Sequence, residues 1–233
     1  MASVIFAPSS PVASLYGDRH LLSGTTRSMA SNLEKVKIER NGDRKIEFDV
    51  YVVGGKGAPG IVVVQEWWGL DYEIKKHAIN IVSQAYRALI PESKFQVCKR
   101  TKLMSDLHLA AILSRVKFRR NQVGVTGFCM GGGLSIASAV RVLGINAVVA
   151  FYGTPPPHLA DPTDKALEEK LKKANVPLEV YLYPNVGHAF MNSSSEAIER
   201  KKATGFGEHH QEAVDLAWSH FDFWFKKYLQ VGK

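Results

Sequence analysis

The chain has 233 residues, a length that suits one α/β domain with a sizeable core. Its composition is 45% hydrophobic and 22% charged, and no apolar run approaches the roughly 20 residues of a membrane-spanning helix. A folded domain without a membrane partner is therefore expected. Cys98 and Cys129 are too few for a disulfide framework and lack zinc-ligand spacing, which indicates a reducing compartment.

The net charge of +8 is concentrated in one segment. Residues 94–120 contain eight lysines or arginines against the single acid Asp106, which leaves +7 there. No aromatic platform or recognition motif accompanies these charges. The segment therefore indicates a solvated surface, and no nucleic-acid partner is expected.

The first 32 residues differ from the rest of the chain in composition. Residues 1–32 are rich in serine and nearly free of acids, which suits either an organelle transit peptide or a disordered tail. The folded domain is expected to span residues 33–233. The protein should be cytoplasmic, or located in a plastid or mitochondrion if residues 1–32 are a transit peptide.

The body of the chain opens with a predicted hairpin. Residues 35–53 form two β-rich runs around Asn41-Gly42, a strong signal for a tight turn. The continuous apolar run "GIVVVQE" at 60–66 predicts a strand buried on both faces of a parallel sheet. Apolar residues at helical spacing over 74–82 and a strand at 87–91 complete a βαβ unit.

Strands and helices then continue to alternate. This order predicts an α/β fold with a mostly parallel sheet and helices on both faces. The expected elements are a weak helix at 105–116, a strand at 122–126, a helix at 132–144, a strand at 146–153, a helix at 164–174, a strand at 177–183 and a helix at 208–229.

The stretch "VTGFCMGGG", residues 125–133, places a cysteine at a strand-to-helix turn. Gly127 and Gly131 remove side-chain bulk beside Cys129, as a strained turn that carries a nucleophile requires. The helix beyond it offers free N–H groups and a positive dipole, which favour a thiolate and an oxyanion. The position therefore suits Cys129 as a nucleophile, but the glycine-flanked cysteine alone is weak evidence, because free cysteine is commonly a small buried apolar residue.

Two further residues suit partners for this cysteine. His188, in "PNVGHAF", lies in a loop after the last strand, so the nucleophile precedes the histidine as in α/β-hydrolases. Glu66 ends a buried strand, where an unpaired carboxylate is costly unless a site uses it.

The motifs "QEWWG", "GFCMGGG" and "GHAF", in this order and with "AFYG" between the last two, resemble the dienelactone hydrolase family of carboxymethylenebutenolidase-like α/β-hydrolases. The resemblance spans residues 34–229. It implies that Cys129 is the nucleophile, His188 its general base and Glu66 the carboxylate that governs the resting state of the thiol. It also implies an oxyanion hole made by the backbone N–H groups of Trp67 and Met130.

The same resemblance implies an activity. Members of the family hydrolyse lactones or esters through an acyl-enzyme, without a metal or cofactor. A small-molecule ester or lactone is therefore the expected partner, and the protein is expected to be a monomer.

The chain departs from the family where the third triad residue should lie. The family places an aspartate after a strand between "AFYG" and the last strand, and no such strand is evident between Gly153 and Pro177. The sheet should therefore lack one strand and contain a gap. Asp161 is the preferred substitute acid, because Asp164 better suits a helix cap. Without an acid the chain would be an inactive or weakly active pseudoenzyme or binding protein.

A second departure concerns anionic substrates. One crossover is shortened and basic, so that only Arg100 could replace the first anion-holding arginine of the family. The second such arginine corresponds to Asn192. A substrate carboxylate therefore loses its expected partners.

Overall fold

The computed structural model describes residues 2–6, 33–40, 46–92, 123–142, 144–153, 169, 173 and 177–229. In chain order, its elements are β1 (Ala2–Phe6), β2 (Glu34–Arg40), β3 (Ile46–Val53), β4 (Gly60–Val64), α2 (Tyr72–Ser83), β5 (Arg87–Pro91), β6 (Val123–Phe128), α4 (Met130–Arg141), β7 (Ala147–Phe151), β8 (Leu178–Leu182), α6 (Ser195–Ala203) and α7 (Gln211–Leu229).

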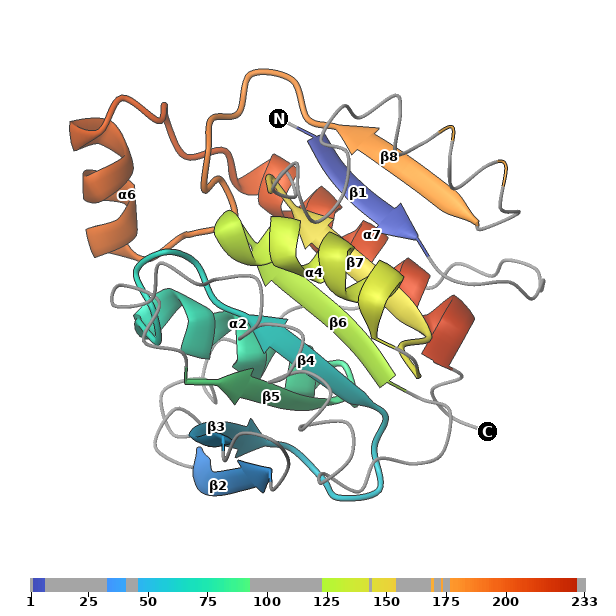
Figure 1. The fold of residues 1–233 in the computed structure, drawn as a ribbon. Helices are drawn as coiled ribbons and strands as arrows, with labels where there is room; N and C mark the ends of the chain where they lie inside the picture. Colours follow the sequence, from blue (N-terminus) through green and yellow to red (C-terminus); the bar gives the residue numbers. More distant parts are fainter. Residues whose placement is uncertain are drawn as a thin grey trace.

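These strands form one twisted sheet in the order β2-β3-β5-β4-β6-β7-β1-β8 (Figure 1). The pairs that join β5, β4, β6 and β7 are parallel. Within the described residues, β1 and β3 run antiparallel to both of their neighbours. Because β1 is antiparallel to β7 and to β8, the last two strands are parallel to each other. The predicted α/β class with a mostly parallel sheet is confirmed.

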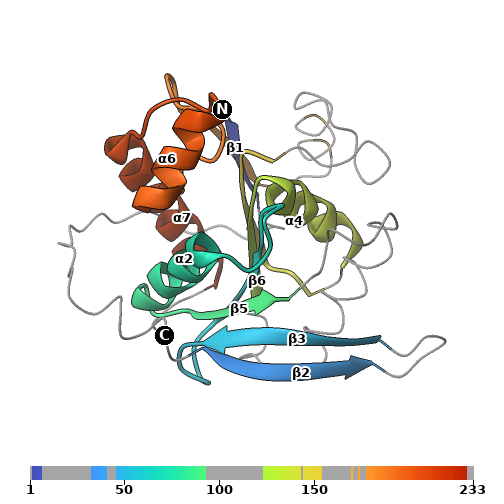
Figure 2. The same ribbon diagram turned by 90° about the vertical axis from the view of Figure 1, so that its left-hand side faces the viewer.

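Helices cover both faces of this sheet (Figure 2). A Cβ added to Gly127 would meet α4, whereas a Cβ added to Gly124 would meet α7. Residues an odd number apart on a strand point to opposite faces, so α4 and α7 lie on opposite sides of β6. At Gly127 the backbone of α4 approaches the strand, whereas at Gly124 the side chains of Phe225 and Leu229 from α7 pack on it.

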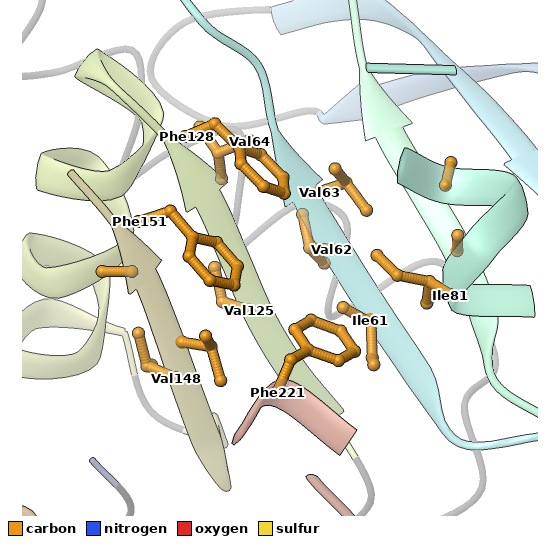
Figure 3. Close-up of a cluster of buried hydrophobic side chains, with 14 of the residues drawn as sticks. Ile61, Val62, Val63, Val64, Ile81, Val125, Phe128, Val148, Phe151 and Phe221 are labelled. Carbon is orange, nitrogen blue, oxygen red and sulfur yellow. The ribbon is translucent and has the colours of Figure 1, made fainter. Parts of the chain in front are cut away.

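Aromatic packing fills the layer between the sheet and α7 (Figure 3). The rings of Phe128 and Phe151 stack with 5.0 Å between their centroids, and Phe221 of α7 stacks on Phe151 at 6.4 Å. All three side chains are fully buried, and each contributes roughly 1.5–3 kcal/mol of hydrophobic stabilisation. The cluster fixes the carboxyl ends of β6 and β7 against the last helix.

Side-chain caps fix where two helices begin. The Asp71 carboxylate accepts a hydrogen bond from the Ile74 N–H at 3.0 Å and starts α2. The Ser194 hydroxyl accepts from the Ala197 N–H at 3.2 Å and starts α6. The sequence pattern did not predict α6, because this helix is short and mostly charged. No helix among the described residues has the length and apolar character to cross a bilayer.

The other predicted elements can be compared one by one. The strands of the hairpin are confirmed, as are the strands and helices predicted from residue 60 to 91 and from 122 to 153, and the last strand and helix. The turn at Asn41-Gly42, the helix at 105–116 and the basic segment 94–120 lie outside the described residues. Of the helix predicted at 164–174, the structure describes only residues 169 and 173, and both are helical.

The first strand corrects the expectation of a gap in the sheet. β1 lies between β7 and β8, with Ser3 opposite Phe151 on one side and Tyr181 on the other. Any extended segment can hydrogen-bond to the backbone N–H and C=O groups of β7 and β8, wherever it lies in the sequence. Ala2–Phe6, within the segment expected to be a disordered tail or transit peptide, thus form a strand of the sheet, and residues 7–32 lie outside the described part of the chain.

A proline in β1 tests this pairing. Every residue of an internal strand uses its N–H in a ladder, so Val4→Pro should remove a hydrogen bond and destabilise the fold by about 3 kcal/mol or more. For a chain of this size the melting temperature should fall by about 6–12 °C.

The matched control is Lys56→Pro, an exposed residue at the second position of the turn closed by the Ala58 N–H and the Gly55 carbonyl oxygen, which should leave the melting temperature close to that of the unchanged protein. Equal melting temperatures for Val4→Pro and Lys56→Pro would contradict the pairing of β1 with β7 and β8.

Candidate active site

The predicted site residues meet at one edge of the sheet. Glu66 follows β4, Cys129 follows β6 and His188 lies in the loop after β8. These strands are parallel, so their carboxyl ends share an edge, which is where α/β sheets form their sites. Tyr152, directly after β7, joins the same group.

Cys129 occupies a strained turn between β6 and α4. Its φ is 56°, in the region that favours glycine. A Cβ at Gly127 would lie 2.1 Å from the Gly131 carbonyl oxygen, and a Cβ at Gly131 would lie 2.3 Å from the Val64 carbonyl oxygen. Both positions require glycine, as the sequence predicted, because the strand and helix backbones touch here.

Glycine is also required across the turn. A Cβ at Gly153 would lie 2.1 Å from the Cys129 carbonyl oxygen. The Cys129 N–H donates to the Phe151 carbonyl oxygen at 3.1 Å, which ties the turn to the end of β7. The turn therefore lifts the half-buried thiol above the sheet and holds it rigidly.

His188 contacts the thiol directly. Its Nε2 lies 3.0 Å from Cys129 Sγ. The rings of Tyr152 and Phe206 pack edge-on against the imidazole, with centroids at 5.2 and 5.3 Å. The next residue, Ala189, has a φ of 58°, so the histidine loop is strained like the cysteine turn.

The electrostatics of this pair favour its uncharged form. Burial raises the pKa of the Cys129 thiol, and the nearby Glu66 carboxylate raises it further. Hydrogen bonds from the backbone N–H groups of Met130 and Trp67 act in the opposite direction and lower the thiol pKa. Burial lowers the pKa of His188. At neutral pH the proton therefore stays on sulfur, and the S–H group donates a hydrogen bond to His188 Nε2.

The other ring nitrogen of His188 consequently carries the proton. Within the part of the chain that the structure describes, no carboxylate accepts a hydrogen bond from Nδ1. Asp161, the acid that the sequence favours, lies outside the described residues. The described residues thus provide a thiol, a base and two backbone donors, but no triad acid.

Glu66 is buried behind the thiol, with 2% of its surface exposed. Its Oε1 accepts from the Tyr152 hydroxyl at 3.1 Å, and its Oε2 accepts from Asn192 Nδ2 at 3.0 Å. Burial raises the pKa of the Glu66 carboxyl, while these two hydrogen bonds lower it. The sequence did not predict these contacts of Tyr152 and Asn192, although "AFYG" marked the position of the tyrosine.

Asn192 is itself buried, with 2% exposure, and its amide is engaged with Glu66. The uncharged Asn192 amide therefore serves as a hydrogen-bond donor to Glu66 inside the protein. The described residues contain no group of three His, Cys, Asp or Glu arranged to bind a metal.

The sequence of this chain is similar to those of known proteins. The chain matches the Dienelactone hydrolase family over residues 48–97, 93–166 and 158–229. Protein usf of Aquifex pyrophilus is 29% identical over 210 residues, which cover 71% of this chain and 90% of that protein. A protein of Escherichia coli K12 named "Putative carboxymethylenebutenolidase" is 24% identical over 220 residues, which cover 73% of this chain and 77% of that protein.

A solved structure agrees with the fold. The crystal structure of a protein named "Putative Dienelactone Hydrolase" from Klebsiella pneumoniae subsp. pneumoniae has a TM-score of 0.62 at 20% identity, and the match covers 84% of this chain and 99% of that one. The sheet, its helices and the strained cysteine turn define an α/β-hydrolase. The family match extends over most of the folded region, and the chain belongs to the dienelactone hydrolase family.

The carboxylate beside the thiol gives a testable prediction. Because the charge of Glu66 raises the pKa of Cys129, Glu66→Gln should shift the pH midpoint of Cys129 alkylation downward. The rate of modification by iodoacetamide, measured against pH in a Cys98→Ser background, reports this midpoint for Cys129 alone.

Glu196→Gln, an exposed change on α6, is the control and should leave the midpoint where it is. A midpoint that is unchanged or higher in Glu66→Gln would contradict the electrostatic coupling between Glu66 and Cys129.

Proposed function

We propose that the protein hydrolyses lactone or ester bonds of small molecules, with Cys129 as nucleophile and His188 as general base. The observation that carries the proposal is the 3.0 Å contact between His188 Nε2 and Cys129 Sγ at a strained strand-to-helix turn. A thiol within hydrogen-bond reach of a base is the arrangement that nucleophilic catalysis needs. Membership of the dienelactone hydrolase family supports the same class of substrate.

The first half of the reaction forms a thioester. His188 Nε2 takes the thiol proton as Sγ attacks the substrate carbonyl carbon, and the carbonyl electron pair moves to oxygen. In this proposal the backbone N–H groups of Met130 and Trp67, whose hydrogen bonds lower the pKa of the thiol in the resting site, donate to the oxyanion. When the C–O bond breaks, His188 gives its proton to the leaving alkoxide. In a lactone this alkoxide stays attached to the acyl chain.

The second half releases the acid. His188 accepts a proton from water, whose oxygen attacks the thioester carbon through a second oxyanion in the same two N–H groups. The C–S bond then breaks, and the sulfur takes the proton back from His188. Each turnover consumes one water and restores the thiol and the neutral imidazole. The buried Glu66 would influence both halves through the ionisation of Cys129.

Removal of the sulfur should abolish turnover. We expect Cys129→Ala to lower hydrolysis of an activated ester such as p-nitrophenyl acetate by at least about a thousandfold, because the nucleophile acts as a unit with its base. In the unchanged protein, mass spectrometry should detect an acyl group on Cys129. Cys98→Ser removes the other thiol and should keep full activity. Hydrolysis that survives Cys129→Ala would overturn the assignment of the nucleophile.

The triad acid requires a separate measurement. If Asp161 accepts from His188 Nδ1, then Asp161→Asn should slow acylation at least about a hundredfold without unfolding the protein. Asp164→Asn, at the expected helix cap, should change the acylation rate little. Equal acylation rates in the two variants would exclude Asp161 as the triad acid.

A function of a different class is favoured by one observation, the lack of a carboxylate on His188 Nδ1 among the described residues. Under this second hypothesis the chain is a pseudoenzyme or binding protein that keeps the site without turnover. Absence of both acylation and labelling of Cys129 in the folded protein would select it. Steady-state hydrolysis that depends on Cys129 would reject it.

A further inference from the structure

Hydrogen bonds connect three side chains behind the thiol, those of Glu66, Asn192 and His77. Asn192 donates from Nδ2 to Glu66 Oε2 at 3.0 Å, and its Oδ1 lies 3.1 Å from His77 Nε2. An amide oxygen can only accept a hydrogen bond, so His77 must be the donor. This contact decides which end of the Asn192 amide faces the carboxyl group. The N–H end faces Glu66 because His77 occupies the oxygen end.

The packing around His77 fixes the orientation of its ring for this hydrogen bond. It lies on α2 with 2% exposure, and its ring stacks on Phe128 at 4.2 Å between centroids with 20° between the planes. Trp218 of α7 also packs against the imidazole, tilted by 57° with 5.6 Å between ring centroids. Burial lowers the pKa of His77, so the imidazole is neutral and holds its single proton on Nε2.

The backbone around Asn192 is also fixed. Lys201 Nζ donates to the Asn192 carbonyl oxygen at 2.8 Å. The two carboxylate oxygens of Glu73 accept from the N–H groups of Ser193 and Ser194, each at 3.0 Å. The backbone that carries the Asn192 side chain is therefore held from both α2 and α6.

We propose that Asn192, oriented by His77, is a positioning residue that holds the Glu66 carboxyl beside Cys129 and sets the pH at which this carboxyl ionises. The structural claim is independent of turnover, and its consequence for catalysis rests on the proposed function. Neither residue touches the thiol, and both act through Glu66.

The surroundings of Glu66 support this assignment. The ionisable groups that face it from the neighbouring elements are Cys129, Tyr152, Asp71, Arg200 and Lys201. Asp71 raises the pKa of Glu66 and Arg200 lowers it, so their charges oppose each other. Among the influences that favour the carboxylate, the hydrogen bond from Asn192 is the largest. Burial has the largest effect on the pKa of Glu66 and raises it, and the hydrogen bond from this neutral amide is the strongest influence that opposes burial.

Loss of the His77 donor should reverse the Asn192 amide. With nothing to hold Oδ1, the amide can turn its oxygen toward Glu66, and an oxygen opposite a carboxyl group favours the protonated acid. The pH midpoint of Glu66 ionisation should then rise. Glutamine places its side-chain N–H where His77 Nε2 lies, so it should preserve the orientation.

The experiment follows the Glu66 carboxyl carbon by NMR in the full-length protein with carbon-13-labelled glutamate, and Glu66→Gln identifies the signal. We expect His77→Leu and Asn192→Ala to raise the Glu66 midpoint by about one pH unit, the size expected for one hydrogen bond to a charged group. His77→Gln should retain the original midpoint. Ser193→Ala, which removes only the contact with Lys76 at 2.6 Å, is the matched control and should also retain it.

Equal midpoints in His77→Leu and His77→Gln, whether both raised or both unchanged, would overturn the proposal. If Asn192→Ala does not fold, the two His77 variants decide the outcome by themselves. The titration needs no substrate, so a protein without hydrolytic activity can still show the shift. Loss of the proposed function and loss of this inference are thus separate results.

Discussion

The close approach of backbone to backbone around Cys129 is the constraint on which the rest of the site depends. Gly127 touches the first turn of α4, Gly131 touches the end of β4, and Gly153 touches the Cys129 carbonyl oxygen. No side chain fits at these three places. Because three strand ends are brought this close, the thiol, the two backbone donors and Glu66 come within reach of one another.

A second constraint is electrostatic. The site places an ionisable carboxyl group where water does not reach it, and no cation is paired with it directly within the described residues. Neutral donors, a phenol and an amide, satisfy its oxygens instead. A buried charge that is hydrogen-bonded but unpaired responds strongly to small changes around it. Because the Glu66 carboxylate raises the pKa of Cys129, groups that hydrogen-bond Glu66 can influence the thiol without touching it.

The sequence predicted the parts of the site whose signals are local. Gly127 and Gly131 lie two residues from Cys129, and the loop of His188 follows an apolar strand, so both patterns are visible along the chain. The hydrogen bond between His77 and Asn192 joins residues 115 positions apart, and neither residue has a local pattern that indicates the contact. Long-range polar contacts of this kind depend on how helices and loops pack, which periodicity does not describe.

The difference between local patterns and long-range contacts also explains which strands and helices were predicted from the sequence. Buried strands such as β4 and β7 were predicted because their apolar runs are continuous and their burial is complete. β1 was missed because five apolar or small residues stand at the start of a serine-rich segment whose overall composition indicates a tail. α6 was missed because its caps and charges, rather than an apolar face, define it.

The direction of β1 determines which of its ends lies at the edge of the sheet that holds the site. An extended segment can complete a hydrogen-bonded sheet in either direction. Only one of its two ends lies at the edge of the sheet that holds Cys129 and His188. In β1 that end is the amino end, since Ala2 lies opposite Leu182 and Phe6 opposite Val148. The carboxyl end of β1, at Phe6, therefore lies at the edge of the sheet remote from His188. β1 contains no aspartate or glutamate, so this strand completes the hydrogen-bonded sheet without itself supplying an acid to the histidine.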